Sequence, residues 1–380
     1  MENVERMSFI SQIAPADQVS QLINLLFQVA YPLFFIIFLL YGNKIQVRTW
    51  LWDIEKSLNK LKIMRDKTKQ ITIDTLKETG KTSDDMMARL DRMMEFFLIE
   101  PVSLDPAGIV GKLDHLITLE EERFKEDIRL ITPSANDIQI HNYSLSVEVA
   151  AALNTFYRVV RHYYVQGKRT MSIYSIMQLQ MSMPLIMEMA ESYSKAAEAI
   201  SVGQPIGDAA GAMVAGKLMH GMPARKVAKD TVMAEVPMDG RALLVLKAEG
   251  PGGTVGKPGE GIVNLIEERN GKIAMLIMID AGLKLEGEKS GEAFEGIGAA
   301  IGGPGVDKFK IEEVLTKYKI PVNAVVIKES MVESISAMKK SLIDGVDDSI
   351  KRVRRLVAEK TKEGDTIIVA GIGNTLGVAQ

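Results

Sequence analysis

Cysteine is absent from all 380 residues. Its absence excludes disulfide bonds, thiol catalysis and cysteine-ligated zinc or iron–sulfur sites. Histidine is scarce, with four residues in the chain. His115, His141 and His162 stand apart from one another, so we expect surface or packing roles rather than metal ligation. His220 precedes Gly221 at an expected helix end, where a C-cap role is the default.

A large excess of charge of one sign is also missing. The formal net charge is −3 and the sequence pI is about 6.0. We therefore do not expect a dedicated nucleic-acid-binding protein, and we predict that the protein has no nucleic-acid partner. The length allows two or three domains, and a hydrophobic content of 47% supplies a sizeable core. The 22 methionines are interpreted as flexible filling of helical cores, with an adaptable docking surface as the alternative.

One long stretch lacks charge altogether. No charged residue occurs between Gln18 and Asn43, and most residues there are apolar. About 20 such residues span the hydrocarbon core of a bilayer, and Pro32 is tolerated in a membrane helix. We predict a short lead-in over residues 1–21 and a transmembrane helix over 22–43, with a buried core helix as the alternative. A cleaved signal peptide is not expected, because the leader is acidic and the apolar stretch is too long.

The flanking charges predict the orientation of this segment. The residues before it are mostly acidic, whereas many basic residues follow it. These basic residues are Lys44, Arg48, Lys56, Lys60, Lys62, Arg65, Lys67 and Lys69. Positive charge is retained on the cytoplasmic side of a membrane. We therefore expect a single-pass protein of the cell membrane that contacts the lipid bilayer and whose C-terminal domain is cytoplasmic.

Residues 44–200 are expected to form a helical juxtamembrane domain. Within 45–99, apolar residues recur at steps of three and four, as on one face of a helix. These residues include Ile54, Leu58, Leu61, Met64 and Ile71. Residues 143–200 predict two more helices, the second stopped or kinked at Pro184. Paired long helices near a membrane favour a homo-oligomer, although the pattern is too irregular for a strict heptad coiled coil.

The composition changes at Ser201, beyond which glycine is frequent and apolar runs are short. The expected strands are Ala242–Ala248, Ile273–Ile279, Ala324–Lys328 and Thr366–Ala370. The expected helices are Ala209–His220, Ile262–Arg269, Lys310–Tyr318, Met331–Leu342 and Asp347–Thr361. This alternation predicts a three-layer α/β domain with a mostly parallel sheet over residues 201–380.

Two short stretches of this domain predict a ligand site. Residues 204–218 indicate a tight turn that leads into an Ala/Gly-rich helix, with Asp208 near its N-cap. Residues 365–374 indicate a buried strand that ends in a Gly-x-Gly-Asn turn at Asn374. If the strand lies beside the turn, Asp208 lies at the carboxyl edge of a parallel sheet, where open α/β sheets bind their ligands.

Asp280 is the second candidate acid. It ends the apolar run 274–279, and such a position places a carboxylate at the carboxyl end of a strand. An aspartate there also commonly caps a turn. Two carboxylates that converge on one cleft share a proton or bind a metal ion, so Asp208 and Asp280 are interpreted as a candidate pair.

Two glycine-rich loops invite comparison with nucleotide-binding motifs. Residues 249–259 fail the P-loop pattern, because Pro251 and Pro258 occupy positions that need glycine and Ser/Thr. Residues 295–305 resemble a dinucleotide fingerprint, but no apolar strand precedes them. A flexible flap over a cleft is expected for the first loop, and main-chain amides of either loop could form an anion nest.

The chain as a whole resembles an archaeal, membrane-anchored family designated only as a domain of unknown function. Residues 204–375 show a second, more distant resemblance. The turn 205–214 is similar to the Gly-Asp turn of the spore germination protease family, and 279–283 resembles that family's Ile-Asp-Ala-Leu element. Residues 329–336 look like a later segment of that family. The strand and Gly-x-Gly-Asn turn at 370–374 resemble the element that opens both that family and the hydrogenase maturation endopeptidases.

In those enzymes the Gly-x-Gly-Asn strand comes before the Gly-Asp turn, so the resemblance implies a circularly permuted, hydrolase-like domain. It implies Asp208 and Asp280 as catalytic acids. It also implies Gly207, Gly371, Gly373 and Asn374 as substrate-binding or oxyanion residues. No histidine follows His220, so the usual third ligand of a hydrogenase-linked metal site is missing. The expected site therefore uses aspartates without a metal or cofactor.

Two functions remain open from the sequence. The first is a membrane-tethered hydrolase, an aspartate-dependent endopeptidase acting on a protein or peptide, in which Asp208 and Asp280 activate a water molecule. The second is a non-enzymatic scaffold or ligand sensor that oligomerises through its helical domain. The two functions differ in geometry, because a hydrolase needs both carboxylates within about 3–6 Å of a shared water in one cleft.

Overall fold

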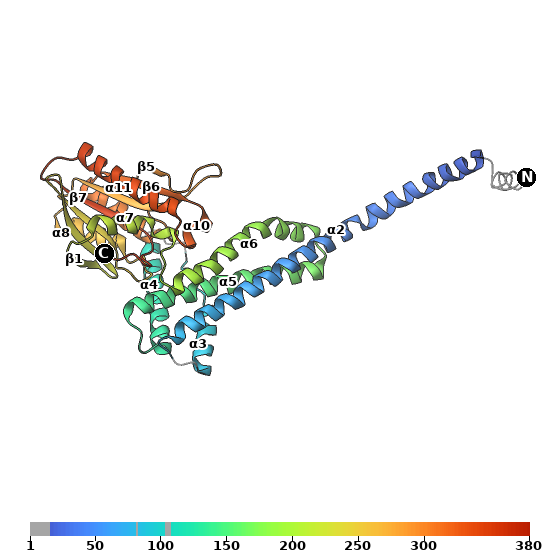
Figure 1. Ribbon diagram of the computed structural model, residues 1–380, viewed down its shortest axis with the longest axis horizontal. Helices are drawn as coiled ribbons and strands as arrows, with labels where there is room; N and C mark the ends of the chain where they lie inside the picture. Colours follow the sequence, from blue (N-terminus) through green and yellow to red (C-terminus); the bar gives the residue numbers. More distant parts are fainter. Residues whose placement is uncertain (1–15, 81–82, 103–107) are drawn as a thin grey trace, which may run out of the picture. The chain divides into compact units, whose positions relative to one another are not determined.

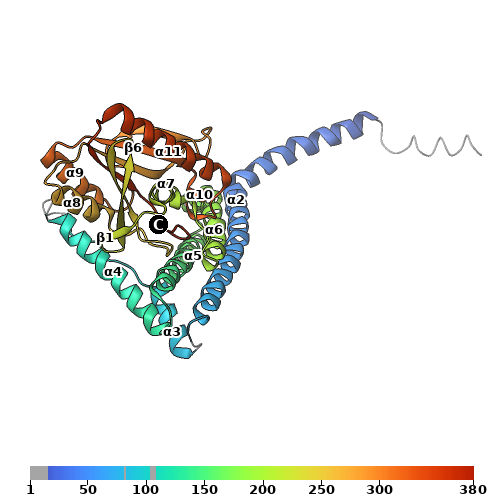
Figure 2. The ribbon, with the colours of Figure 1, turned by 60° about the vertical axis from the view of Figure 1, so that its left-hand side comes forward.

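The computed structural model describes residues 16–80, 83–102 and 108–380 (Figures 1 and 2). Most of the expected lead-in over 1–21 lies outside the described residues. The described chain is helical up to Ser201 and mixes helices with one sheet beyond it. The predicted α/β class, with a helical N-terminal region, is therefore confirmed.

The chain divides into two compact units. The first contains the residues up to Asn59 and Val159–Pro184, and the second contains Lys60–Arg158 and Leu185–Gln380. Because the boundary cuts through three helices, neither unit coincides with a single stretch of sequence. The sheet and all candidate site residues belong to the second unit.

The first unit is helical. It contains the first part of α2 (Ala16–Lys77), the end of α5 (Asp137–Thr170) and the start of α6 (Ile173–Ser201). Gly167 on α5 allows α6 to approach, because a Cβ at this position would lie 2.7 Å from a side-chain carbon of Ile176. The two helices thus form a tightly packed hairpin.

The predicted membrane-spanning segment lies within α2. Among the described residues, no single helix is both long and apolar enough to cross a membrane. Two segments of α2, Ile23–Ile36 and Tyr41–Lys77, are together long and apolar enough to cross a membrane, and a bend of 58° separates them. Exposed apolar side chains on the first segment include Leu25, Phe27 and Phe34. The membrane crossing stays a prediction.

The helical part of the second unit combines the end of α2 with α3 (Asp84–Met94), α4 (Ile109–Ile131), most of α5 and the end of α6. Ser83 begins α3 by accepting a hydrogen bond from the main-chain N–H of Met86 at 3.1 Å. Buried apolar side chains hold these helices together. They include Leu76, Leu90, Ile128, Tyr143 and Val147.

The sheet of the C-terminal domain has seven strands in the order β1-β2-β3-β7-β4-β6-β5. The central strands β3, β7, β4 and β6 are parallel, and antiparallel strands flank them on both sides. The last strand of the chain therefore lies inside the sheet, as predicted. The strand bounds are β1 Ala224–Ala228, β2 Thr231–Met238, β3 Arg241–Ala248, β4 Met275–Leu283, β5 Ala293–Ile297, β6 Val322–Glu329 and β7 Thr366–Gly371.

Helices cover both faces of this sheet (Figure 1). One core joins α7 (Ala210–Met219) and α11 (Lys340–Lys360) to one face. A second core joins α8 (Pro258–Glu268) and α9 (Val306–Tyr318) to the other face. The central strands are mostly apolar because both of their faces are buried, which is why their sequences predicted them.

Three strands were not predicted from the sequence: β1, β2 and β5. β1 and β5 lie at the edges of the sheet and carry charged residues such as Arg225 and Glu295. An edge strand needs fewer apolar residues than a central one, so the apolar-run criterion does not detect it. β2 lies inside the sheet and is mostly buried, but Glu235 and Pro237 interrupt its apolar run.

The predicted helix Met331–Leu342 is wrong. The chain forms the short helix α10 (Met331–Ile335), leaves helical geometry at Ser336 and resumes with α11 at Lys340. The interruption has a tertiary cause, because Ala337 forms an isolated β-bridge with Ile206. Helical periodicity continues through this segment and does not reveal the competing partner.

Candidate functional site

Asp280 lies on β4, close to the carboxyl end of the central strands. Strand pairing continues three residues beyond it, to Leu283. The side chain is buried, with 9% of the residue surface exposed. Its carboxylate accepts hydrogen bonds from the main-chain N–H of Ala281, at 2.8 Å, and of Gly302. Main-chain donors from β4 and from the loop 301–305 therefore hold the carboxylate in place.

Asp208 lies in a 3₁₀ turn, η1 (Gly207–Ala209), that leads into α7. It does not cap the helix, because the N-cap of α7 is Ala209 and no side chain accepts a capping bond there. The carboxylate Oδ2 of Asp208 instead accepts the main-chain N–H of Asn374 at 2.7 Å. The predicted position of Asp208 near the N-cap is therefore confirmed, but its carboxylate bonds to a distant segment instead of capping the helix.

Gly373 makes this approach sterically feasible. Its φ of 120° favours glycine, and a Cβ at this position would collide with the carbonyl oxygen of Asp208. The Gly-x-Gly-Asn turn after β7 thus lies against the turn that carries Asp208. The predicted proximity of Asn374 and Asp208 is confirmed.

One cavity brings the two acids together. This inner cavity has a volume of about 280 Å³ and is bordered by Asp208, Asp280 and Gly373. It lies at the carboxyl edge of β4 and β7, the position where open α/β sheets bind ligands. Both glycine-rich loops border it, through residues 255–258 and 301–305. Helix α4 contributes Asp114, Ile117 and Glu121 to the wall.

Burial dominates the electrostatics of the pair. Burial, followed by the charge of Asp208, raises the pKa of Asp280 to about 7, although the N–H groups of Ala281 and Gly302 oppose the shift. Burial also raises the pKa of Asp208, against the hydrogen bond from Asn374. Two acids coupled in this way titrate as a unit, and near neutral pH the pair retains a proton.

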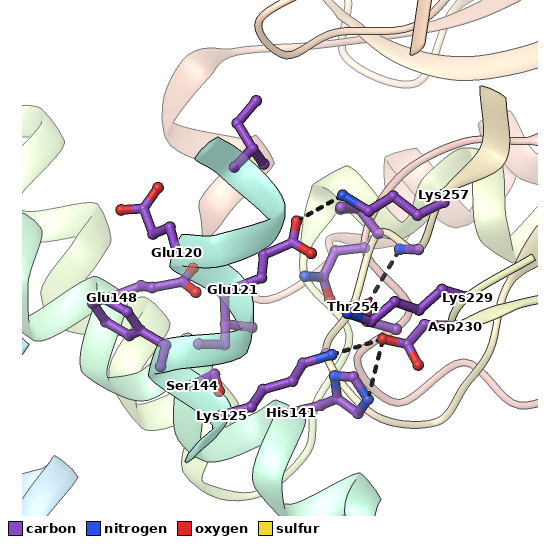
Figure 3. A pocket seen from close by; sticks show the side chains of 17 residues that line it. Glu120, Glu121, Lys125, His141, Ser144, Glu148, Lys229, Asp230, Thr254 and Lys257 are labelled. Carbon is purple, nitrogen blue, oxygen red and sulfur yellow. Dashed lines mark hydrogen bonds and ion pairs between the residues drawn. The ribbon is translucent and has the colours of Figure 1, made fainter. Parts of the chain in front are cut away.

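An outer cavity of about 400 Å³ adjoins the inner one (Figure 3). The two share lining residues Ile117, Glu121 and 255–257. Asn374 borders the outer cavity, and Ile372 and Gly373 border the inner one, so the turn after β7 contributes to both. The two cavities are therefore neighbours along α4, which lines both of them.

Ion pairs organise one side of the outer cavity. Lys125 contacts Asp230 at 2.7 Å, and His141 lies 3.8 Å from the same carboxylate. Lys257 contacts Glu121 at 3.3 Å. Burial and the charge of Lys125 lower the pKa of His141, so this histidine is neutral at physiological pH and belongs to the cavity wall. The expectation that it is an isolated surface or packing residue missed this position.

Carboxylates line the opposite side of the outer cavity. Glu148 on α5 faces Glu120 and Glu121 on α4 (Figure 3). Burial, followed by the charges of Glu120 and Glu121, raises the pKa of Glu148 to about 7. Many protein atoms surround the carboxyl group of Glu148, but the side chain itself is exposed to solvent in the cavity. The sequence carried no signal for this group, because its members come from two separate helices.

Gly207 and Gly371 border neither cavity. A Cβ at Gly371 would collide with the main chain of Gly211 on α7, and a Cβ at Gly207 would collide with the Glu329 carboxylate. Both glycines therefore allow close packing next to the site. Their assignment as substrate-binding or oxyanion residues stays a prediction.

Among the residues that the structure describes, no group of three or more histidine, aspartate or glutamate side chains has a metal-binding arrangement. The groups of the inner cavity instead suit proton transfer. Asp280 carries a proton near neutral pH, and Asp208 is a hydrogen-bonded carboxylate beside it. Main-chain N–H groups of the loop 301–305 lie nearby.

Comparison with known proteins identifies the family of the chain. No curated protein matches it significantly. Residues 28–203 match the N-terminal model of a protein of unknown function (DUF1512), and residues 206–379 match the C-terminal model of the same family. Together the two matches cover almost the entire chain, and the protein therefore belongs to the DUF1512 family.

Proposed function

We propose that the protein is a membrane-anchored hydrolase, an aspartate-dependent peptidase whose acids are Asp208 and Asp280. One observation carries this proposal: both carboxylates border the same cavity at the carboxyl edge of a parallel sheet. The raised pKa of Asp280 supports it, since a general acid needs a proton near neutral pH.

The two acids take complementary roles. Asp208 is the ionised member, because its negative charge raises the pKa of Asp280, whereas Asp280 exerts no such effect on Asp208. Asp208 removes a proton from the attacking water. The water oxygen bonds to the carbonyl carbon of the peptide, and Asp280 gives its proton to the carbonyl oxygen. When the intermediate collapses, Asp280 recovers that proton, the C–N bond breaks and the proton on Asp208 passes to the leaving amine.

The outer cavity provides room for the substrate. The two adjacent cavities together have the space for an extended peptide segment. The loops 255–258 and 301–305 offer main-chain groups that can hydrogen-bond to it. A protein or peptide is therefore the proposed substrate. The apolar first part of α2 and the basic residues after it support a single-pass anchor with a cytoplasmic catalytic domain.

The test uses the full chain in detergent micelles with a mixture of unfolded peptides. New peptide termini are quantified by mass spectrometry. Asp208→Asn and Asp280→Asn are each expected to reduce cleavage by at least about 100-fold, the usual contribution of general acid–base catalysis.

Asp307→Asn is the matched control. Asp307 borders the same cavity, but it accepts the main-chain N–H of Gly259 at 3.0 Å, and asparagine retains an acceptor. Cleavage by this variant should stay within a few-fold of wild type. Equal cleavage by wild type, Asp208→Asn and Asp280→Asn would contradict the proposal. Absence of cleavage by the folded wild-type protein would favour the non-enzymatic scaffold.

A further inference from the structure

Glu329, at the end of β6, is a buried acid with one carboxylate oxygen that lacks a hydrogen-bond partner. Only 2% of its surface is exposed, and its Oε2 has no hydrogen-bond partner. Glu333, one helical turn further along, differs sharply. Its carboxylate accepts bonds from Ser290 Oγ at 2.6 Å and Lys339 Nζ at 2.9 Å. Donors that satisfy a buried carboxylate are thus present at Glu333, four residues away, but none contacts Glu329 Oε2.

The side chain of Glu329 lies against the turn that carries Asp208. A Cβ added at Gly207 would collide with Glu329 Oε2, so Gly207 keeps this space free. The parallel pairing of β6 with β4 places Glu329 beside Leu283, three residues beyond Asp280. Glu329 does not border the inner cavity.

Among the described residues, the charges that shift the pKa of Glu329 are negative: Asp208 from η1, Glu333 from α10 and Asp280 from β4. The nearby cations are engaged elsewhere. Lys328 forms an ion pair with Glu288, and Lys339 pairs with Glu333. Within the described structure, no basic side chain therefore offsets a charge on Glu329.

A buried carboxylate that lacks both a counter-ion and a hydrogen-bond donor is too costly to remain charged, and it takes up a proton instead. The electrostatics agree with the geometry, because burial, followed by the charges of Asp208, Glu333 and Asp280, raises the pKa of Glu329 to about 8. The structure thus holds three carboxyl groups near one turn, and they do not all ionise together.

We infer that Glu329 is a positioning residue of the acid pair: kept neutral by its buried position against the Asp208 turn, it lets Asp208 carry the negative charge. This inference rests on the proposed function for its catalytic meaning. When Glu329 ionises at higher pH, Asp208 is already ionised, so two negative charges then repel each other at the buried face of the turn. The turn therefore becomes less stable above the pKa of Glu329.

Glu329→Gln tests the inference in the full chain, because glutamine is a permanently neutral isostere. The apparent Tm of the C-terminal domain is measured from pH 5 to pH 9. A folded pKa above the unfolded value stabilises the protein at low pH, and this stabilisation is lost as the pH rises toward 8. The Tm of Glu329→Gln relative to wild type should therefore rise by about 5 °C or more across this range.

Glu333→Gln is the control with the opposite sign. Hydrogen bonds from Ser290, Ser330 and Lys339 outweigh burial and lower the pKa of Glu333 to about 2. Its stabilisation is present above the unfolded pKa and is lost only as the pH falls toward 2. Glu333→Gln should therefore be less stable than wild type throughout pH 5–9, without the rising difference expected for Glu329→Gln.

A double-mutant cycle ties Glu329 to the site without an activity assay. In an Asp208→Asn background, one of the charges that face Glu329 is gone, so the pH-dependent gain from Glu329→Gln should shrink clearly. If Glu329→Gln and wild type melt in parallel from pH 5 to pH 9, or if Asp208→Asn leaves the gain unchanged, the inference is overturned.

The peptide assay distinguishes a failure of the inference about Glu329 from a failure of the proposed hydrolase function. In an active protein, Glu329→Gln should remain active near neutral pH and keep the alkaline fall that loss of the Asp280 proton causes, whereas loss of cleavage by a folded Glu329→Gln protein would overturn the inference alone. If wild type cleaves no peptide, the proposed function fails, and the melting curves still decide whether a neutral Glu329 is coupled to Asp208.

Discussion

At the scale of single residues, the two aspartates illustrate how an environment changes a carboxyl group. The sequence positions of Asp208 and Asp280 suggest a site, but each residue could equally be a turn-capping aspartate. In the structure, Asp208 bonds to a segment 166 positions away and Asp280 is almost completely buried. Burial, more than any single contact, makes them acids with raised pKa values.

We predict that Asp280→Asn stabilises the protein at alkaline pH. The folded pKa of about 7 lies above the unfolded value, so Asp280 favours folding at low pH, and this contribution is lost as the pH rises through 7. At pH 8, the variant should gain about 2–4 kcal/mol in free energy of unfolding. At pH 4 the two proteins should be nearly equal.

Chemical denaturation at both pH values measures this difference. Asp348→Asn is the control, because Asp348 is exposed and paired with Arg352, and an exposed ion pair contributes little. A gain for Asp280→Asn that is the same at pH 4 and pH 8 would show that the ionisation of Asp280 is not its cause.

At the scale of elements, the crossing of α7 over β7 and β4 determines the geometry of the site. A Cβ at Gly211 on α7 would collide with the carbonyl oxygens of Ile279 and Ile372, and a Cβ at Gly371 would collide with Gly211. The absence of side chains at both positions lets the helix lie directly on the strands. This contact brings the Asp208 turn to the edge of the sheet.

We predict that Gly211→Ala and Gly371→Ala each destabilise the C-terminal domain by about 2–3 kcal/mol, because the colliding atoms belong to the main chain and cannot move aside. Thermal melting followed by circular dichroism measures the loss. Gly111→Ala is the matched control, since nothing lies within 4 Å of a Cβ at that position in α4. It should be neutral or stabilising by up to about 1 kcal/mol. Equal stability of all three variants would mean that the close approach of α7 contributes nothing.

At the scale of the whole molecule, the chain combines a long N-terminal helix with an α/β domain that contains its last strand. Strand β7 lies between β3 and β4, and its apolar side chains Ile367, Ile368 and Val369 are fully buried. The end of the sequence is therefore central to the core. Loss of these residues would remove a middle strand.

The flanking charges predict the topology of the anchored protein. Protease added outside intact cells should leave residues 44–380 undigested, and an alkaline wash should not release the protein from membranes. Immunoblotting against a C-terminal tag follows both outcomes, and permeabilised cells serve as the control. Digestion of the tagged domain in intact cells would reverse the orientation, and release by the wash would rule out a spanning anchor.

The sequence by itself determined the elements whose signal is local. Long apolar runs identified the strands β3, β4, β6 and β7, because central parallel strands are buried on both faces. Helical periodicity identified the helical region before Ser201. The position of Asp280 after an apolar run and the glycine turn before Asn374 also pointed to the acid pair.

Only the tertiary structure decided which distant segments of the chain contact one another. The split between α10 and α11 depends on a bridge between Ile206 and Ala337, and the outer cavity depends on α4 and α5 facing loops of the C-terminal domain. Glu329 reads as an ordinary charged residue in the sequence. Its neutral state follows from burial against the Asp208 turn, because the cost of a charge depends on what surrounds it and not on its neighbours along the chain.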